Sequence, residues 1–172
     1  MSKPEAKRAS PRDVEIKLAE PGDEEIISSL IFEAFAPFRA EYTADAFDYT
    51  AVSVETVRGR FAEGPIWLAY DRGEPVGTVS GLPEEERFYI RSMAVKPGLQ
   101  RSGVGQRLLE VLEAFARDAG YEKLYLYTTL ILPGGKRLYE KNGFYVLRET
   151  PPEEWYGMGG LEMEKKLNAI GS

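Results

Sequence analysis

A glycine-rich, basic segment is the part of this sequence best suited to chemistry. Residues 91–109 read RSMAVKPGLQRSGVGQRLL, so a strand-like run ends at a Pro-Gly pair and an amphipathic helix begins at about Ser102. Glycines let the main chain approach an anion, and the first N–H groups of a helix point toward it. Arg101 and Arg107 add positive charge, which favours a phosphate or pyrophosphate over a lone carboxylate. The segment therefore predicts a backbone anion site for a diphosphate ligand.

Two other anion-binding motifs fit this segment poorly. A P-loop needs a lysine and a hydroxyl residue directly after its second glycine, whereas Val104 and Gly105 follow Gly103. A dinucleotide-binding G-x-G-x-x-G would start at Gly103, but Leu108 stands at its third glycine position. The spacing thus argues against phosphoryl transfer and against a dinucleotide fold.

Two segments, in order and spacing, resemble the GNAT family of acyl-CoA N-acyltransferases. Residues 100–105 (QRSGVG) match the family signature [QR]-x-x-G-x-[GA], and residues 138–144 (LYEKNGF) resemble its (L/F)-Y-x-K-x-G-F segment. Residues 93–95 resemble the end of its cofactor-binding strand, and the whole resemblance covers roughly residues 65–167. It implies an α/β GNAT fold, in which a mixed six- or seven-stranded central sheet, flanked by about four helices, splays to hold acyl-CoA.

The resemblance also implies a set of site residues. Tyr139 matches the family's catalytic tyrosine, whose phenol gives a proton to the departing thiolate. Acetyl-CoA is the implied cofactor, and no metal is implied. Its contacts are expected at Met93, Ala94, Val95, Gln100, Arg101, Ser102, Gly103, Val104, Gly105, Gln106 and Tyr139.

Acyl transfer from a thioester to an amine sets three demands: a neutral amine, a stabilised oxyanion and a proton for the thiolate. A phenol with a pKa near 10 stays protonated at neutral pH, so Tyr139 can act as the acid, although such a tyrosine can also be a packing residue. A backbone N–H near Met93 or Val95 is the expected oxyanion donor. The base stays open between Glu33, the run Glu84–Glu86 and a water chain.

The sequence departs from the family near the tyrosine helix. Leu132 stands where many members carry an asparagine that touches the pantetheine arm, and residues 133–135 (PGG) replace a commoner alanine-led start. The pantetheine contacts therefore stay open. Lys136, Arg137 and Lys141 could meet the adenosine 3′-phosphate or form a solvated helix face.

Composition excludes several kinds of chemistry. The 172 residues include no histidine and no cysteine, so thiol nucleophiles, Ser-His pairs, disulfides and His or Cys zinc ligands are excluded. The net charge of −6 argues against a nucleic-acid partner. No apolar run approaches the roughly 20 residues that cross a bilayer, and the first residues lack a signal-peptide core. We therefore expect a cytoplasmic protein with no membrane partner.

The hydrophobic pattern predicts the elements that position these residues. Residues 1–12 are polar and carry two prolines, which predicts a disordered lead before a single domain over 13–168. The alternation of strands, helices and hairpins favours a mixed sheet. Strands are expected at about 13–19, 66–70, 75–82, 87–95, 124–129, 144–147 and 160–167, and helices from 23 to about 37, from about 53 onward, and at about 102–119 and 133–142.

The amine acceptor is open at this stage, as are the acyl chain length and a homodimeric state. A small molecule or a peptide fits equally. Several aromatic residues are candidates for the acceptor wall: Phe35, Phe38, Tyr42, Phe47, Tyr49, Trp155 and Tyr156. The alternative is a non-catalytic acyl-CoA-binding or sensory domain, which would keep the loop without turnover.

Overall fold

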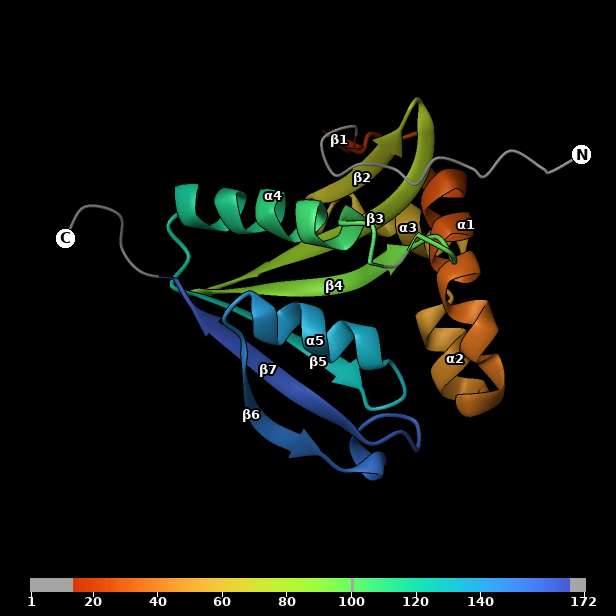
Figure 1. The fold of residues 1–172 in the computed structure, drawn as a ribbon, viewed down its shortest axis with the longest axis vertical. Helices are drawn as coiled ribbons and strands as arrows, with labels where there is room; N and C mark the ends of the chain where they lie inside the picture. The colour runs from red at the N-terminus through yellow and green to blue at the C-terminus, as the bar shows by residue number, and fades with distance from the viewer. Residues whose placement is uncertain (1–13, 100, 168–172) are drawn as a thin grey trace, which may run out of the picture.

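A seven-stranded mixed sheet in the order β1-β2-β3-β4-β5-β7-β6 forms the centre of the protein (Figure 1). The computed structural model describes residues 14–99 and 101–167. Its strands are β1 (Val14–Leu18), β2 (Ile66–Asp71), β3 (Glu74–Glu84), β4 (Arg87–Val95), β5 (Lys123–Thr129), β6 (Tyr145–Thr150) and β7 (Gly160–Lys166). Its α-helices, over the same residues, are α1 (Glu24–Phe35), α2 (Ala44–Thr50), α3 (Val54–Arg60), α4 (Val104–Asp118) and α5 (Pro133–Lys141), with 3₁₀ turns η2 (Ala36–Glu41) and η3 (Pro152–Glu154).

The expected α/β fold with a mixed sheet of six or seven strands is confirmed: the sheet has seven strands, and the described residues form five α-helices where about four were expected. Helices cover both faces of the sheet. The side chains of β2 point alternately toward one face and the other. Trp67 and Ala69 belong to the core under α4, whereas Ile66 and Leu68 belong to the core under α1 and α3. Successive residues of a strand point to opposite faces, so a continuous apolar run fits a strand buried on both sides. The predicted lead over residues 1–12 lies outside the described residues.

Helix α2 was not expected from the sequence. It has only seven residues, begins where the Thr43 side chain accepts a hydrogen bond from the Ala46 N–H at 3.1 Å, and buries Ala46 and Phe47. Phe47 packs there with Tyr42 and Met158, a residue from the far end of the chain. A helix this short depends on tertiary contacts rather than on its own propensity, so local periodicity does not reveal it.

The sheet opens between its two central strands. β4 and β5 run parallel and pair only over Arg87–Tyr89 with Lys123–Tyr125. β4 continues to Val95 and β5 to Thr129, and beyond the paired residues the two strands diverge (Figure 1). The opening is therefore built into the strand pairing.

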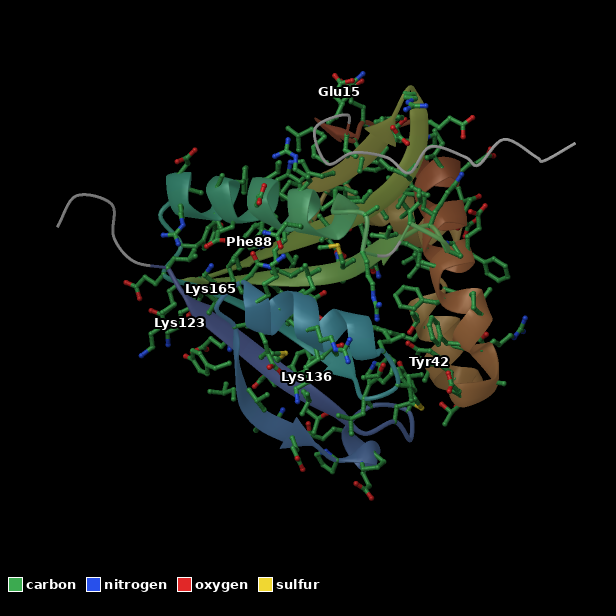
Figure 2. The ribbon with its side chains drawn as sticks, in the orientation of Figure 1. Glu15, Tyr42, Phe88, Lys123, Lys136 and Lys165 are labelled. Carbon is green, nitrogen blue, oxygen red and sulfur yellow. The ribbon has the colours of Figure 1, made fainter. Side chains whose placement is uncertain are left out.

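Helix α4 crosses one face of the β1 to β4 half. Its seam of Val104, Leu108, Leu109 and Leu112 is fully buried against the core that contains Phe88. Figure 2 shows Phe88 beneath this helix, close to the start of β4. Because Phe88 comes from the residues that pair with β5, the buried seam anchors the joint between the two halves of the sheet.

Candidate active site

A β-bulge interrupts β4 just before its end. Thr78 of β3 lies opposite Ala94, and Ser80 lies opposite Arg91, so β4 carries one extra residue in this interval. Ser92 has a φ of +55°, which is uncommon for a residue other than glycine. A bulge leaves the extra residue out of the ladder and re-aims the side chains that follow it.

The bulge exchanges the two faces of β4. Before it, the even-numbered Phe88 and Ile90 point into the core under α4; after it, the odd-numbered Met93 and Val95 pack against that core, and Ala94 points into the α1 core instead. Met93, Ala94 and Val95 were predicted to bind the cofactor. The structure places Met93 on a cavity wall and buries the Ala94 side chain, so Ala94 can offer a ligand only its main chain.

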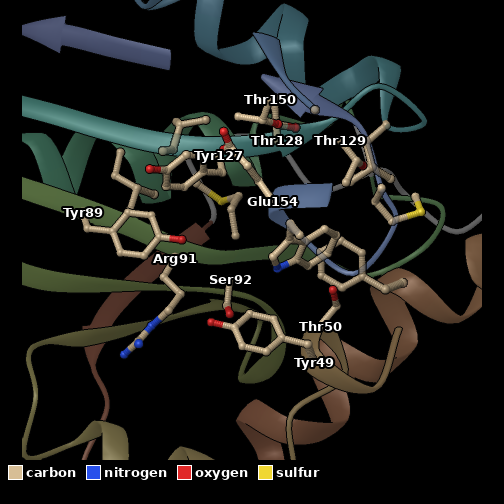
Figure 3. Close-up of a pocket in the computed structure, with 18 of the residues that line it drawn as sticks. Tyr49, Thr50, Tyr89, Arg91, Ser92, Tyr127, Thr128, Thr129, Thr150 and Glu154 are labelled. Atoms are coloured by element: carbon tan, nitrogen blue, oxygen red, sulfur yellow. The ribbon is translucent and has the colours of Figure 1, made fainter. Parts of the chain in front are cut away.

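A cavity of about 400 Å³ lies where β4 and β5 diverge (Figure 3). Residues of α2, α3 and β4 form one side of it, and residues of β5 and of the segment from β6 to β7 form the other. Figure 3 shows Tyr49, Arg91 and Ser92 on one side and Thr128, Thr129 and Thr150 on the opposite side. The cavity therefore combines strand ends from both halves of the sheet with side chains of the helical segment before β2.

Tyr139, the predicted acid, lies on the wall of this cavity with the bulge residues Ser92 and Met93. Helix α5 holds its ring edge-on to Phe144, with ring centroids 5.6 Å apart, and the residue is only 7% exposed. No hydrogen bond joins the Tyr139 hydroxyl to any of the described residues. Burial, with a smaller contribution from Tyr89, raises the pKa of the Tyr139 phenol well above its usual value of 10. The phenol is therefore protonated throughout the neutral range.

The glycine-rich loop follows directly after β4. Gly98 and Gly103 have φ values of +86° and +93°, and Arg101 has a φ of +69°. The Ser102 N–H and hydroxyl both donate to the Leu99 carbonyl, which closes the turn. Gln100, another predicted contact, lies outside the described residues.

The start of α4 offers its main-chain donors. The first intrahelical hydrogen bond runs from the Arg107 N–H to the Gly103 carbonyl at 3.0 Å, so the N–H groups of Val104, Gly105 and Gln106 precede the helical ladder. A β-carbon on Gly105 would lie 3.3 Å from the Leu138 side chain, so this glycine lets α4 and α5 approach closely. The arrangement fits a diphosphate bound by main-chain N–H groups.

The side chains of the predicted loop contacts have other roles. Val104 is fully buried, and the Gln106 side chain forms hydrogen bonds with Asn142 and Glu110. Residues 101–106 do not line the cavity, and they lie at the far end of β4 from its pairing with β5. The predicted contacts thus divide between the glycine-rich loop with the start of α4 and a separate cavity lined by Met93 and Tyr139.

The structure brings four of the seven aromatic residues predicted for the acceptor wall to this cavity. Phe35, Tyr42, Tyr49 and Trp155 line the cavity, whereas Phe38, Phe47 and Tyr156 do not. Sequence reasoning missed Tyr89 and Tyr127, whose rings lie 6.0 Å apart. Their position on β4 and β5, in apolar strands that end at the opening, is the signal that could have found them.

The carboxylates considered as bases lie elsewhere. Glu33 and Glu84–Glu86 are not among the cavity residues, and Glu84 accepts a hydrogen bond from the Tyr125 hydroxyl. The carboxylate that does line the cavity is Glu154, whose two oxygens each accept from Arg148 at 2.9 Å. Leu132, at the position where the resembled family often has asparagine, also lines it.

The cavity carries three arginines besides this carboxylate: Arg60, Arg91 and Arg148. Arg91 donates to Glu63 at 2.5 Å, and Arg60 donates to the Ser92 hydroxyl at 2.8 Å. Burial, and then the nearby charge of Arg91, lower the pKa of the Arg60 guanidinium to about 10.

Over the described residues, no cluster of three or more acidic, His or Cys side chains could hold a metal ion, and no helix is long and apolar enough to span a bilayer.

Comparisons with known proteins identify the family of this chain. The mouse protein named probable N-acetyltransferase family 8 member 5 is 33% identical over 89 residues, which are 48% of this chain and 39% of that protein. Human N-acetyltransferase 8 is 31% identical over 84 residues, 45% of this chain and 37% of that protein. The matched part thus spans about two fifths of the length of these relatives.

Solved structures share the fold. PaiA N-acetyltransferase from Thermoplasma acidophilum, in complex with coenzyme A, superposes with a TM-score of 0.76 at 19% identity, over 90% of this chain and 99% of that chain. A GNAT family acetyltransferase from Elizabethkingia anophelis with acetyl-CoA bound gives a TM-score of 0.71 at 21% identity, again over 90% and 99%. A sequence profile of the acetyltransferase (GNAT) family matches residues 27–144, most of the chain. The chain therefore belongs to the GNAT acetyltransferase family.

Proposed function

We propose that the protein is an N-acetyltransferase that moves the acetyl group of acetyl-CoA directly to a primary amine on a small molecule or a peptide. The observation that carries the proposal is that a buried, protonated Tyr139 and the bulge of β4 share one cavity at the opening of the sheet. That cavity would supply both an acid and the main chain of the bulge to one reaction space.

Acetyl-CoA, the cosubstrate of this family, fits the chain at both places. The loop of Arg101–Gln106 and the first turn of α4 would hold the diphosphate through main-chain N–H groups, because Gly103 gives the loop its left-handed turn. The divergence of β4 from β5 leaves room for the pantetheine arm toward the cavity. Acetyl-CoA supplies an activated acyl carbon, and the remaining tasks fall to residues of this chain.

The roles of those residues follow from their positions. Main-chain N–H groups near Met93 donate to the carbonyl oxygen of the thioester, where negative charge develops. The neutral amine nitrogen bonds to the acetyl carbon and passes one proton to water, the carbon–sulfur bond breaks, and Tyr139 gives its phenolic proton to the leaving sulfur. Solvent then returns a proton to Tyr139. The raised pKa keeps the phenol in the form that can donate.

Deprotonation of the acceptor ammonium is assigned to water in the cavity. Glu154 lies on the wall, but its two hydrogen bonds with Arg148 occupy both carboxylate oxygens. Cytoplasmic location and a homodimeric state stay predictions of the sequence.

The test is release of CoA thiol from acetyl-CoA in the presence of a panel of amines. We expect thiol release that depends on the amine, together with an acetylated product of matching amount by mass spectrometry. Tight binding of acetyl-CoA, measured by calorimetry, without product from any amine would instead support the non-catalytic alternative.

A further inference from the structure

Arg60 is a buried cation on the cavity wall. It is the last residue of α3, and only 7% of its surface is exposed. It reaches β4, where its guanidinium donates to the Ser92 hydroxyl at the bulge. The end of α3 and the bulge of β4, which are distant in sequence, thus hold the Arg60 guanidinium next to Ser92, the residue that precedes Met93.

Its partners do not neutralise its charge. Among the described residues, Arg60 forms no ion pair with a carboxylate, and its hydrogen-bond partner is a neutral hydroxyl. The nearby Glu63 is engaged by Arg91. Arg91 also lines the cavity, and its buried Nε has no hydrogen-bond partner. Within the part of the chain that the structure describes, Arg60 and Arg91 thus have one ion-pair partner between them, Glu63, and that partner is held by Arg91.

Such an arrangement is costly without an anion. A buried charge is normally paired, and two cations in one wall repel each other. Both effects appear in the lowered pKa of Arg60, whose causes are burial first and the charge of Arg91 second. A guanidinium also offers a fork of donors that matches the two oxygens of a carboxylate.

We propose that Arg60 and Arg91 bind a carboxylate of the acceptor, so that the acceptor is an amino acid or a similar amine with a carboxylate close to its nitrogen. The inference rests on the proposed function. The carboxylate must lie near the amine because Ser92, the partner of Arg60, directly precedes Met93 at the assigned site of acetyl transfer. The rings of Tyr49, Tyr89 and Trp155 on the same cavity favour an apolar or aromatic side chain on that amino acid.

Matched acceptors test the carboxylate in the unmodified protein. Acetyl transfer would be compared for L-phenylalanine, L-phenylalaninamide and phenethylamine, which share the ring and differ in the carboxylate. We expect kcat/KM for phenylalanine to be about 10- to 100-fold higher after correction for the fraction of neutral amine, as for a charge-assisted hydrogen bond. Equal or better use of the amide or of phenethylamine overturns the inference and leaves the proposed function standing.

Variants locate the effect at Arg60. Arg60→Gln should remove most of the preference for phenylalanine over its amide, with little change in KM for acetyl-CoA, and Arg60→Lys should keep part of it. Arg58→Gln is the matched control, because Arg58 lies on the same helix with 64% of its side chain exposed. An unchanged preference in a folded Arg60→Gln variant, checked by thermal unfolding, overturns the assignment.

A binding measurement separates this inference from failure of the proposed function. N-acetyl-L-phenylalanine and its amide lack a free amine, so their binding can be measured without turnover. Trp155 on the cavity wall gives a fluorescence signal that reports binding, in addition to the constant signal of the buried Trp67. Preferential binding of the acid, lost in Arg60→Gln, supports the carboxylate site even if no amine is acetylated. Equal binding of acid and amide contradicts it.

The acyl group is the other source of a carboxylate. Succinyl-CoA and acetyl-CoA would therefore be compared with phenethylamine as acceptor. A preference for succinyl-CoA that depends on Arg60 would assign the site to the acyl donor and overturn the acceptor assignment, whereas a preference for acetyl-CoA agrees with it.

Discussion

Gln106 in the first turn of α4 and Asn142 at the end of α5 exchange two side-chain hydrogen bonds, of 2.8 Å and 2.7 Å. The same Asn142 amide also donates to the Leu138 carbonyl at 2.7 Å. The helix that would bind the diphosphate is thus tied through side chains to the helix that carries Tyr139.

We expect Asn142→Ala to lower the free energy of unfolding by about 1–2 kcal/mol, since it removes the two hydrogen bonds with Gln106 and the one to the Leu138 carbonyl, leaving Glu110 as the remaining partner of the Gln106 side chain. Urea unfolding of Asn142→Ala, Gln106→Ala and the double variant gives the coupling between the two side chains. The double variant should lose less than the sum of the single losses by at least about 0.5 kcal/mol. Strict additivity would show that the pair is not energetically linked.

Gly103→Asp should weaken CoA binding well beyond the tenfold that corresponds to about 1.4 kcal/mol, because it places a carboxylate beside the assigned diphosphate site. The φ of +93° strains any side chain there, so Gly103→Asn is the matched control. Calorimetry should show a much larger loss for Asp than for Asn. Equal affinities of the two folded variants would remove the diphosphate from this loop.

Tyr139→Phe keeps the ring packing against Phe144 and removes the proton. If chemistry limits turnover, kcat should fall by about 10²–10⁴-fold while acetyl-CoA affinity changes little. Single-turnover acetyl transfer separates this from slow product release. Because the raised pKa keeps Tyr139 protonated, its ionisation should not reduce the wild-type rate below pH 10. A single-turnover rate equal to wild type would make the phenol a packing residue.

The titration of Tyr89 should couple stability to alkaline pH. Burial is the main cause that raises the pKa of its phenol from 10 to about 12. Above pH 10 the unfolded chain loses this proton while the folded protein keeps it, so the contribution is full below pH 10 and is lost as pH rises toward 12. The loss should reach about 1.4 kcal/mol per pH unit.

Denaturant unfolding at several alkaline pH values, compared between wild type and Tyr89→Phe, isolates this contribution. The variant should lose stability less steeply than wild type above pH 10. Tyr156→Phe, which makes the same change at an exposed position, serves as the control. Parallel curves for wild type and Tyr89→Phe would contradict the assigned shift.

Gly81→Ala should destabilise the fold through one contact. A β-carbon at Gly81 would lie 2.2 Å from the ring of the fully buried Phe88, so the ring would have to move. We expect a loss of about 1–3 kcal/mol, measured by urea unfolding. Gly59→Ala is the control, because no atom lies within 4 Å of the added carbon and the site is inside α3. Gly59→Ala should be neutral or stabilising by up to about 1 kcal/mol.

The sequence predicted the features that depend on neighbouring residues in the chain. The strands, α1, α4, α5 and the glycine-rich turn followed from periodicity and from Pro and Gly positions, and each lies within a few residues of its expected bounds. The bulge at Ser92 could not be predicted, because register depends on the partner strand β3. The sequence analysis singled out neither Arg60 nor Arg91 as a site residue, since only the packing of α3 against the sheet brings them to one cavity.

Because β4 and β5 pair over only a few residues, the sheet consists of two halves with few hydrogen bonds between them. The first half comprises β1 to β4, the second comprises β5, β7 and β6, and direct strand pairing joins them only over Arg87–Tyr89. No strand hydrogen bonds between the described residues resist separation along the diverging stretch, so we expect local opening to occur along this line. A molecule bound between β4 and β5 would hold the two halves of the sheet together. The amide hydrogens of both strands would then exchange more slowly with deuterium than in the unbound protein.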